Sequence, residues 1–239
     1  MHAPRITLSV VSHRQNALVN GLVADLARGN EELALVVTEN VPDEAPLVTA
    51  PFMGTLNVVR NERPRGFAAN HNAAFARCAT PFFCVANPDI RLRGNPFPAL
   101  RAALEGDRVA VAGPLVRNPA GRVEDSARRF PTPGSAARRF FSAPAGPDYP
   151  ADRGPLEVDW VAGMFMLFDT ATFGALGGFD ERYFLYYEDV EICRRLHRGG
   201  YRVRYVPGAE VVHDARRASR RDPALLRHHL LGAFRFFTT

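Results

Sequence analysis

The sequence predicts one α/β domain built on a mostly parallel β-sheet that is covered by helices. Two observations support this fold class. Short apolar runs of strand length alternate with segments of helical periodicity along most of the chain, an order typical of parallel sheets. The 239 residues, 46% of them hydrophobic and 23% charged, are also enough to bury one substantial core.

The first half of the chain shows the alternation most clearly. Apolar runs predict strands at residues 6–11, 33–37, 56–59, 82–86 and 109–112. Helices are expected after the polar cluster 12–16, with an end at Gly29 and Asn30, then over 65–75, and from Pro96 to Gly106. Because parallel strands need such crossover helices, this order indicates a parallel sheet.

The second half begins with a change of character. Residues 117–155 contain seven prolines and the arginine pairs Arg128–Arg129 and Arg138–Arg139, so they predict a long loop that is either functional or disordered. Regular structure is expected to resume with a strand at 158–168, a short helix at 170–177, a helix ending at Gly199 and Gly200, and strands at 201–207 and 211–213. From Arg216 onward the pattern is that of a basic amphipathic helix.

The basic residues limit the possible functions. The chain has no lysine, so all 30 of its Lys and Arg residues are arginine. Mechanisms that need a Schiff-base or phosphate-loop lysine are excluded, and a sugar-nucleotide pyrophosphorylase with them. The net charge of +5 suits nucleic acid, an anionic membrane or a phosphorylated ligand. The arginines are concentrated in 117–155 and in the tail rather than interleaved with exposed aromatic side chains on one sheet, and we therefore expect no nucleic-acid partner.

The cysteines and the apolar runs indicate the cellular setting. Cys78, Cys84 and Cys193 are odd in number and lie in apolar or helical patterns, which predicts reduced thiols and no zinc site. The longest strongly apolar run, residues 160–168, is too short to span a bilayer. We therefore expect a cytoplasmic protein, either soluble or peripheral at the inner face of the plasma membrane.

Polar side chains follow several predicted strands at the point where each strand ends. Glu39, Asn61 and Asp89 each lie just past such an end, so they are expected to converge on one crevice of the sheet. Glu39 or Asn61 alone reads equally as a surface residue, and Asn87-Pro88-Asp89 alone as a turn. His213 alone is more typical of a satisfied edge residue. Together with Asp89 it forms a candidate site for a hard divalent cation that a diphosphate completes.

Residues 179–195 combine aromatic and acidic side chains on a short link that enters a helix. The aromatic rings can exclude water, while the free N–H groups and the dipole of the helix start favour a negative charge. A carboxylate at that position is a plausible general base.

Short motifs along the chain follow a recognisable order. They are Val10-Val11-Ser12-His13-Arg14, Glu39-Asn40, Arg60-Asn61, Gly66-Phe67-Ala68-Ala69 with Asn72, Asn87-Pro88-Asp89, Gly177-Gly178-Phe179-Asp180-Glu181, Phe184-Leu185-Tyr186-Tyr187-Glu188-Asp189, Gly200-Tyr201-Arg202-Val203 and His213. Each motif is weak by itself, and the Phe-Asp-Glu block with its Glu-Asp partner is the most specific. The series resembles family 2 glycosyltransferases of the GT-A fold, particularly their rhamnosyltransferase-like bacterial branch.

The resemblance implies an inverting transfer of a sugar, with rhamnose favoured, from a nucleotide-sugar to a hydroxyl of a glycan or lipid-linked glycan. It implies a dTDP- or UDP-sugar donor and a Mg²⁺ or Mn²⁺ cofactor. The roles implied are nucleotide-sugar binding by Ser12, Glu39, Asn61, Asn72 and Asn87, metal binding by Asp89 and His213, proton abstraction by Asp189 with Glu188 orienting it or the acceptor, and acceptor contacts by Gly163, Asp180 and Glu181.

On this reading the domain 1–239 has a nucleotide-sugar-binding half at 1–116, a flexible flap at 117–156, and an acceptor and catalytic half at 157–239. Three positions depart from the family pattern: Asn87 is neutral where an aspartate is frequent, Glu39 replaces a shorter aspartate, and Ala74 replaces a frequent glycine. The rival interpretation is a nucleotide-sugar-binding partner subunit without turnover. The basic tail is either a core-packing helix or a contact to an anionic membrane, through Arg216, Arg217, Arg220 and Arg221.

Overall fold

A computed structural model describes residues 5–29, 33–50, 52–135, 146–213 and 223–239. Its main sheet has nine strands among these residues, with β8 at the side of β11 and the others in the order β3-β2-β1-β4-β10-β6-β11-β5. Six run in one direction: β1 (Ile6–His13), β2 (Leu33–Val41), β3 (Thr55–Arg60), β4 (Phe82–Ala86), β6 (Val109–Arg117) and β11 (Arg202–His213). The opposite direction is taken by β5 (Ile90–Arg91), β8 (Leu156–Glu157) and β10 (Phe165–Asp169). The predicted mostly parallel α/β sheet is confirmed.

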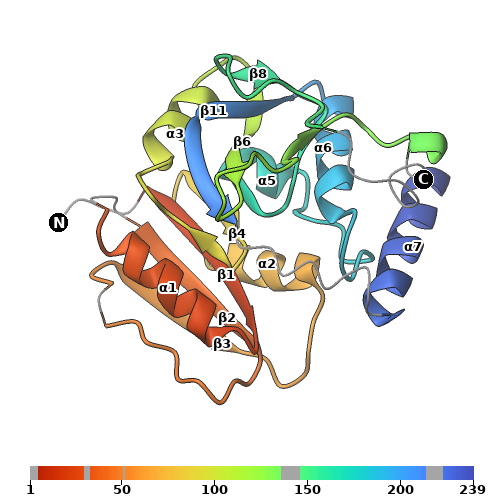
Figure 1. The fold of residues 1–239 in the computed structure, drawn as a ribbon. Coiled ribbons are helices and arrows are strands. Elements are labelled where there is room, and N and C mark those ends of the chain that lie inside the picture. Colours follow the sequence, from red (N-terminus) through yellow and green to blue (C-terminus); the bar gives the residue numbers. More distant parts are fainter. Residues whose placement is uncertain (1–4, 30–32, 51, 136–145, 214–222) are drawn as a thin grey trace.

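Helices cover both faces of this sheet (Figure 1). They are α1 (Asn16–Leu26), α2 (Phe67–Phe75), α3 (Phe97–Leu104), α5 (Thr170–Ala175), α6 (Glu188–Arg198) and α7 (Pro223–Thr238). Successive strand residues point to opposite faces, so Leu35 packs in the core under α1 while Val36 packs in the core under α2 and α6. Burial on both faces explains why the strands are continuous apolar runs in the sequence.

The strands β1, β2 and β6 extend beyond their predicted ends, so Glu39 lies within β2 and not past it. Two further strand predictions in the second half were wrong. The run 158–168 is split into β9 (Trp160–Val161), which pairs with β7 (Ala127–Arg128), and β10. The break occurs because the Gly163 N–H donates to the Asp189 carboxylate (2.8 Å) instead of to a neighbouring strand. The runs 201–207 and 211–213 form the single strand β11. Its register against β6 shifts between Val206 and Glu210, which lets the strand continue past Pro207.

The described parts of the predicted loop 117–155 are tied to neighbouring structure. The Phe130 N–H and the Tyr149 hydroxyl donate to the Asp159 carboxylate at 2.7 and 3.1 Å, and the Trp160 indole N–H donates to the Arg129 carbonyl at 2.9 Å. The pair Arg138–Arg139, the residue Asn30 and the tail arginines Arg216, Arg217, Arg220 and Arg221 lie outside the described residues. No helix in the described ranges is long and apolar enough to cross a membrane.

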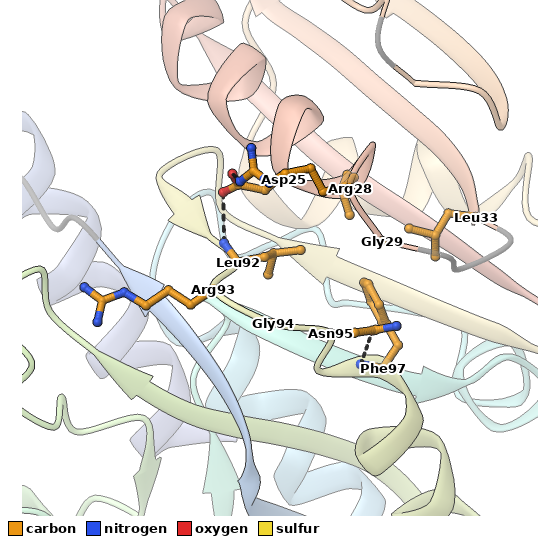
Figure 2. A pocket seen from close by; sticks show the side chains of 10 residues that line it. Asp25, Arg28, Gly29, Leu33, Leu92, Arg93, Gly94, Asn95 and Phe97 are labelled. Carbon is orange, nitrogen blue, oxygen red and sulfur yellow. Dashed lines mark hydrogen bonds and ion pairs between the residues drawn. The ribbon is translucent and has the colours of Figure 1, made fainter.

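A cavity of about 290 Å³ lies at the amino-terminal edge of the sheet, between the end of α1 and the link from β5 to α3 (Figure 2). The buried Asp25 carboxylate on its wall accepts hydrogen bonds from Arg91 (2.6 and 2.8 Å) and from the Leu92 N–H (2.9 Å), and it also pairs with Arg28. These partners hold α1 against β5. None of the predicted site residues lines this cavity.

His71 of α2 makes the stability of the fold depend on pH. Its ring is buried beside the Ser9 hydroxyl, 2.8 Å from Nδ1, and burial lowers the pKa of His71 from 6.5 to about 3. The unfolded chain therefore binds a proton below pH 6.5 that the folded chain does not. The burial of neutral His71 therefore does not lower the free energy of unfolding above pH 6.5. Below that pH the free energy of unfolding falls by about 1.4 kcal/mol for each pH unit, until the pH reaches about 3.

We expect His71→Asn to remove this part of the pH dependence. Urea unfolding of both proteins at pH 7, 6 and 5 gives their free energies of unfolding. The titration of all other groups is shared by the two proteins, so it cancels in the difference at each pH. The stability advantage of the wild type should shrink as the pH is lowered. An advantage that is equal at all three pH values would contradict a neutral buried His71.

Candidate active site

The carboxyl-terminal edge of the sheet gathers most of the predicted site residues. Six parallel strands end there, which places Ser12, Glu39, Asn61, Asn87 and His213 along one edge. Strand β10 runs the other way, so its first residues arrive at this same edge. The parallel topology thus puts Glu39, Asn61 and the Asn87-Pro88-Asp89 segment at one edge of the sheet.

Ser12 and Glu39 are joined through Asn16 at the start of α1. The fully buried Ser12 hydroxyl donates to Asn16 Oδ1 (2.6 Å), and Asn16 Nδ2 donates to Glu39 Oε1 (3.0 Å). Arg60 Nε lies 2.7 Å from Glu39 Oε2 and balances its charge. Sequence reading noted Asn16 only as part of a polar cluster, because its partner lies 23 residues further along the chain. The result is a fixed carboxylate beside the end of β1.

Asn61 lies in a second network, made of amides. Its Nδ2 donates to Asn40 Oδ1 (2.8 Å) and to Asn70 Oδ1 (2.7 Å). Asn40 and Asn70 both donate to the Arg65 carbonyl, at 2.9 and 3.0 Å. From the sequence Asn40 was noted only within the Glu39-Asn40 motif and Asn70 was given no role, although both are buried. The network fixes the chain between β3 and α2 against the end of β2.

Asn72 is grouped by the structure with the acceptor-side residues and apart from Glu39. Its Nδ2 donates to the Phe179 carbonyl (2.8 Å) and to Glu181 Oε1 (3.1 Å), while its Oδ1 accepts from the Phe179 N–H (2.9 Å). Asp180 pairs with Arg182 at 2.6 Å, and this bond, opposing the effect of burial, lowers the pKa of Asp180. Asn72 therefore fixes the segment that leads toward α6.

Asp189 and Glu188 open α6 in a largely apolar surrounding. Asp189 accepts hydrogen bonds from the Gly163 N–H and the Val190 N–H, both at 2.8 Å. Burial raises the pKa of Asp189. Glu188 is 4% exposed, and burial together with the neighbouring Asp189 charge raises its pKa well above the usual value. The two N–H donors favour a negative charge on Asp189, whereas the buried Glu188 Oε2 accepts no hydrogen bond from the described residues.

The backbone before α6 is strained. Tyr186 and Tyr187 both have a φ of 72°, a left-handed conformation that is rare for bulky residues and that gathers at functional sites. Helix α7 packs against this turn, since a Cβ on Gly232 would lie 2.8 Å from the Tyr186 carbonyl. Phe184 stacks on His228 of the same helix with ring centroids 4.7 Å apart. The packing of α7 therefore supports the strained turn that positions Glu188 and Asp189.

Asp89 and His213 meet as the metal hypothesis requires. His213 Nε2 lies 3.3 Å from Asp89 Oδ1, and His213 Nδ1 lies 2.9 Å from Glu124 Oε2. Burial alone would lower the pKa of His213, but the two carboxylates raise it to about 9. Asp89 Oδ1 is buried and makes no well-oriented hydrogen bond to the described residues. No set of three or more potential metal ligands occurs in the parts of the chain that the structure describes.

A backbone contact links this pair to Asp189. The Asn87 N–H donates to the Met164 carbonyl (2.9 Å), and Gly163, the residue before Met164, donates to Asp189. The loop that carries Asp89 is thus joined directly to the Gly163–Met164 turn, and this turn is itself hydrogen-bonded to Asp189 at the start of α6. The Asp89 carboxylate and the His213 imidazole are groups that can hold a divalent cation, and the partly buried Asp189 carboxylate across this contact can remove a proton nearby.

Solved glycosyltransferases share this fold. The structure matches the mannosyltransferase PcManGT from Pyrobaculum calidifontis in complex with GDP-Man and Mn²⁺, with a TM-score of 0.64 and 16% identity, over 98% of this chain and 65% of that one. It matches S. aureus TarS 1-349 in complex with UDP with a TM-score of 0.66 and 13% identity, over 96% of this chain and 64% of that one. The fold is therefore that of the GT-A glycosyltransferases.

The sequence gives the family. The model described as "Glycosyltransferase like family 2" matches residues 4–229, so the chain belongs to this family. It is 40% identical over 160 residues to the N-acetylglucosaminyl-diphospho-decaprenol L-rhamnosyltransferase of Mycobacterium tuberculosis, covering 61% of this chain and 51% of that protein. It is 27% identical over 243 residues to the rhamnosyltransferase WbbL of Escherichia coli K12, covering 97% and 92%. The chain spans about half the length of the mycobacterial relative.

Proposed function

We propose that this chain is an inverting glycosyltransferase that moves a sugar, with rhamnose favoured, from a nucleoside-diphosphate sugar to an acceptor hydroxyl of a growing cell-surface glycan. The observation that carries the proposal is the partly buried Asp189 carboxylate, which two backbone N–H groups orient at the edge of the sheet that also bears Asp89. Similarity to two rhamnosyltransferases supports the choice of sugar.

Asp189 acts as the general base in this proposal. It takes the proton from the acceptor hydroxyl as the oxygen attacks the anomeric carbon, so the configuration inverts in one displacement. Because burial raises its pKa, Asp189 is a stronger base than an exposed aspartate. Burial and the neighbouring Asp189 charge favour the protonated form of Glu188, which orients Asp189 or the acceptor. Gly163, Asp180 and Glu181 form the acceptor side, within the half of the domain at 157–239.

The donor lies on the half at 1–116, with residues 117–156 as the flap. Glu39, Asn61, Asn87 and the backbone near Ser12 contact a dTDP- or UDP-sugar, and the neutral Asn87 amide suits the sugar or the ribose. Asn72, first expected to bind the donor, instead holds the Phe179–Glu181 segment on the acceptor side. Asp89 and His213 hold Mg²⁺ or Mn²⁺, which when bound neutralises charge on the departing diphosphate. The buried Asp89 oxygen that lacks a well-oriented hydrogen bond fits this role. With two protein ligands, diphosphate and water must supply the remaining oxygens.

The acceptor in this proposal is a glycan carried on a lipid, as the name of the mycobacterial relative states for that protein. Helix α7 supports a position at an anionic membrane. Leu230, Leu231 and Phe234 are 56%, 53% and 70% exposed, and the exposed Arg227 shares their face of the helix. Sedimentation with liposomes tests this: binding should rise with the content of anionic lipid and fall in Phe234→Ser. No dependence on anionic lipid would remove the membrane contact.

Stabilisation by ligands tests the donor assignment. A ligand that binds only the folded chain raises its melting temperature, by an amount that grows with ligand concentration relative to Kd. We expect dTDP- or UDP-sugars to raise Tm more than GDP-sugars, and to do so more strongly with Mn²⁺. A transfer assay with the stabilising donor then separates an enzyme from a binding subunit. Stabilisation without transfer to any lipid-linked glycan would favour the subunit.

A further inference from the structure

Glu124 lies on the far side of the His213 ring from Asp89. Its Oε2 is 2.9 Å from His213 Nδ1, while His213 Nε2 is 3.3 Å from Asp89 Oδ1. The three side chains are 10–12% exposed, so solvent contributes little to the orientation of the ring. The imidazole is thus fixed at both nitrogens, by one carboxylate on each.

The backbone around Glu124 is fixed as well. The chain turns back after β6, with a bridge between Arg117 and Val123, and the Glu124 N–H donates to the Val116 carbonyl (2.8 Å). In the sheet, Arg117 is paired with Val212, the neighbour of His213. Glu124 therefore belongs to the end of β6 in space, although the sequence places it in the predicted flap.

We propose that Glu124 is a positioning residue for the metal site and sets which nitrogen of His213 binds the cation. An imidazole binds a metal through an unprotonated nitrogen, and a carboxylate that accepts from the other N–H selects the tautomer and fixes the ring. With Nδ1–H donated to Glu124, Nε2 is directed toward Asp89 and is the ligand nitrogen. The inference rests on the proposed metal-assisted function.

Mn²⁺ binding in the presence of UDP tests the role of Glu124. Electron paramagnetic resonance of free Mn²⁺ gives the Kd, and spin-echo modulation from ¹⁴N reports whether an imidazole is a ligand. Glu124→Ala should weaken Mn²⁺ binding about 10- to 100-fold and lose the imidazole signal. Glu124→Gln keeps a hydrogen-bond acceptor and should restore the signal and part of the affinity. Glu210→Ala is the matched control, since Glu210 pairs with Arg117 at 2.8 Å and leaves His213 untouched.

The outcomes separate this inference from the function on which it rests. Wild-type binding of Mn²⁺ with an unchanged Kd and imidazole signal in Glu124→Ala would overturn the role of Glu124 alone. Absence of Mn²⁺ binding in the wild type would overturn both. Should Glu124→Ala fail to fold, ¹⁵N NMR of the wild type with Cd²⁺ and UDP gives the answer directly. A proton on Nδ1 and none on Nε2 of His213 supports the inference, and the reverse pattern overturns it.

Discussion

Replacing Asp189 with asparagine should abolish sugar transfer while leaving nucleotide-sugar binding nearly intact. The amide oxygen of asparagine can still accept the hydrogen bond from Gly163, so the link between β9 and β10 keeps its geometry. What is lost is the negative charge that takes the acceptor proton. Loss of a general base lowers kcat by about 10²- to 10⁴-fold. Initial rates of transfer measure this effect, and calorimetric titration of the donor gives the Kd, expected to change less than threefold.

The control for Asp189→Asn is Glu157→Gln. Glu157 is 54% exposed and pairs with Arg202 and Arg204 on β11, outside the candidate site. Glu157→Gln therefore removes one carboxylate charge, as Asp189→Asn does, without changing the site. It should keep the wild-type kcat and Kd. Normal turnover by Asp189→Asn would rule out Asp189 as the base. A large rise in the donor Kd would instead place Asp189 in donor binding.

The fold was accessible from the sequence because burial on both faces makes each strand a continuous apolar run. Strand β4 occupies the residues 82–86 that its apolar run predicted. The errors arose where a long-range contact overrides the local pattern. Nothing local in 158–168 shows that the Gly163 N–H will donate to a carboxylate 26 residues further along the chain. Likewise, the continuity of β11 past Pro207 depends on pairing with β6, which no short window contains.

The residues of the candidate site could be predicted from the sequence only in part, for a similar reason. Residues near strand ends, such as Glu39 in the last residues of β2 and Asp89 after β4, have a positional signal, since the ends of parallel strands share an edge. The residues that orient these side chains have no such positional signal in the sequence. Asn16 and Glu124 act through partners 23 and 89 residues away, and both looked like ordinary loop positions. Asn16 could have been found by the same reasoning, because it comes shortly after the end of β1, at the edge where Glu39 lies near the end of β2.

Asp89→Asn should remove the dependence of donor binding on metal. Asparagine keeps the size of the side chain but removes the anionic oxygen, now buried without a well-oriented hydrogen bond, that the proposal gives to the cation. In the wild type, Mn²⁺ should strengthen UDP binding, because cation and diphosphate share ligands. In Asp89→Asn the Kd for UDP should be the same with and without Mn²⁺, and kcat should fall at least about 10²-fold, since the leaving diphosphate is no longer neutralised.

Comparison of Asp89→Asn with Asp189→Asn distinguishes the two carboxylates. Both variants should transfer sugar poorly, but only Asp89→Asn should lose the gain in UDP affinity that Mn²⁺ confers on the wild type. Calorimetric titration of UDP, with Mn²⁺ or with EDTA, measures that gain in each variant. If Asp89→Asn retains the full gain, the cation is held elsewhere and the pairing of Asp89 with His213 is structural. If both variants lose it, the two loops joined by Asn87 and Met164 act as one metal-binding unit, and Asp189 cannot be assigned as the base alone.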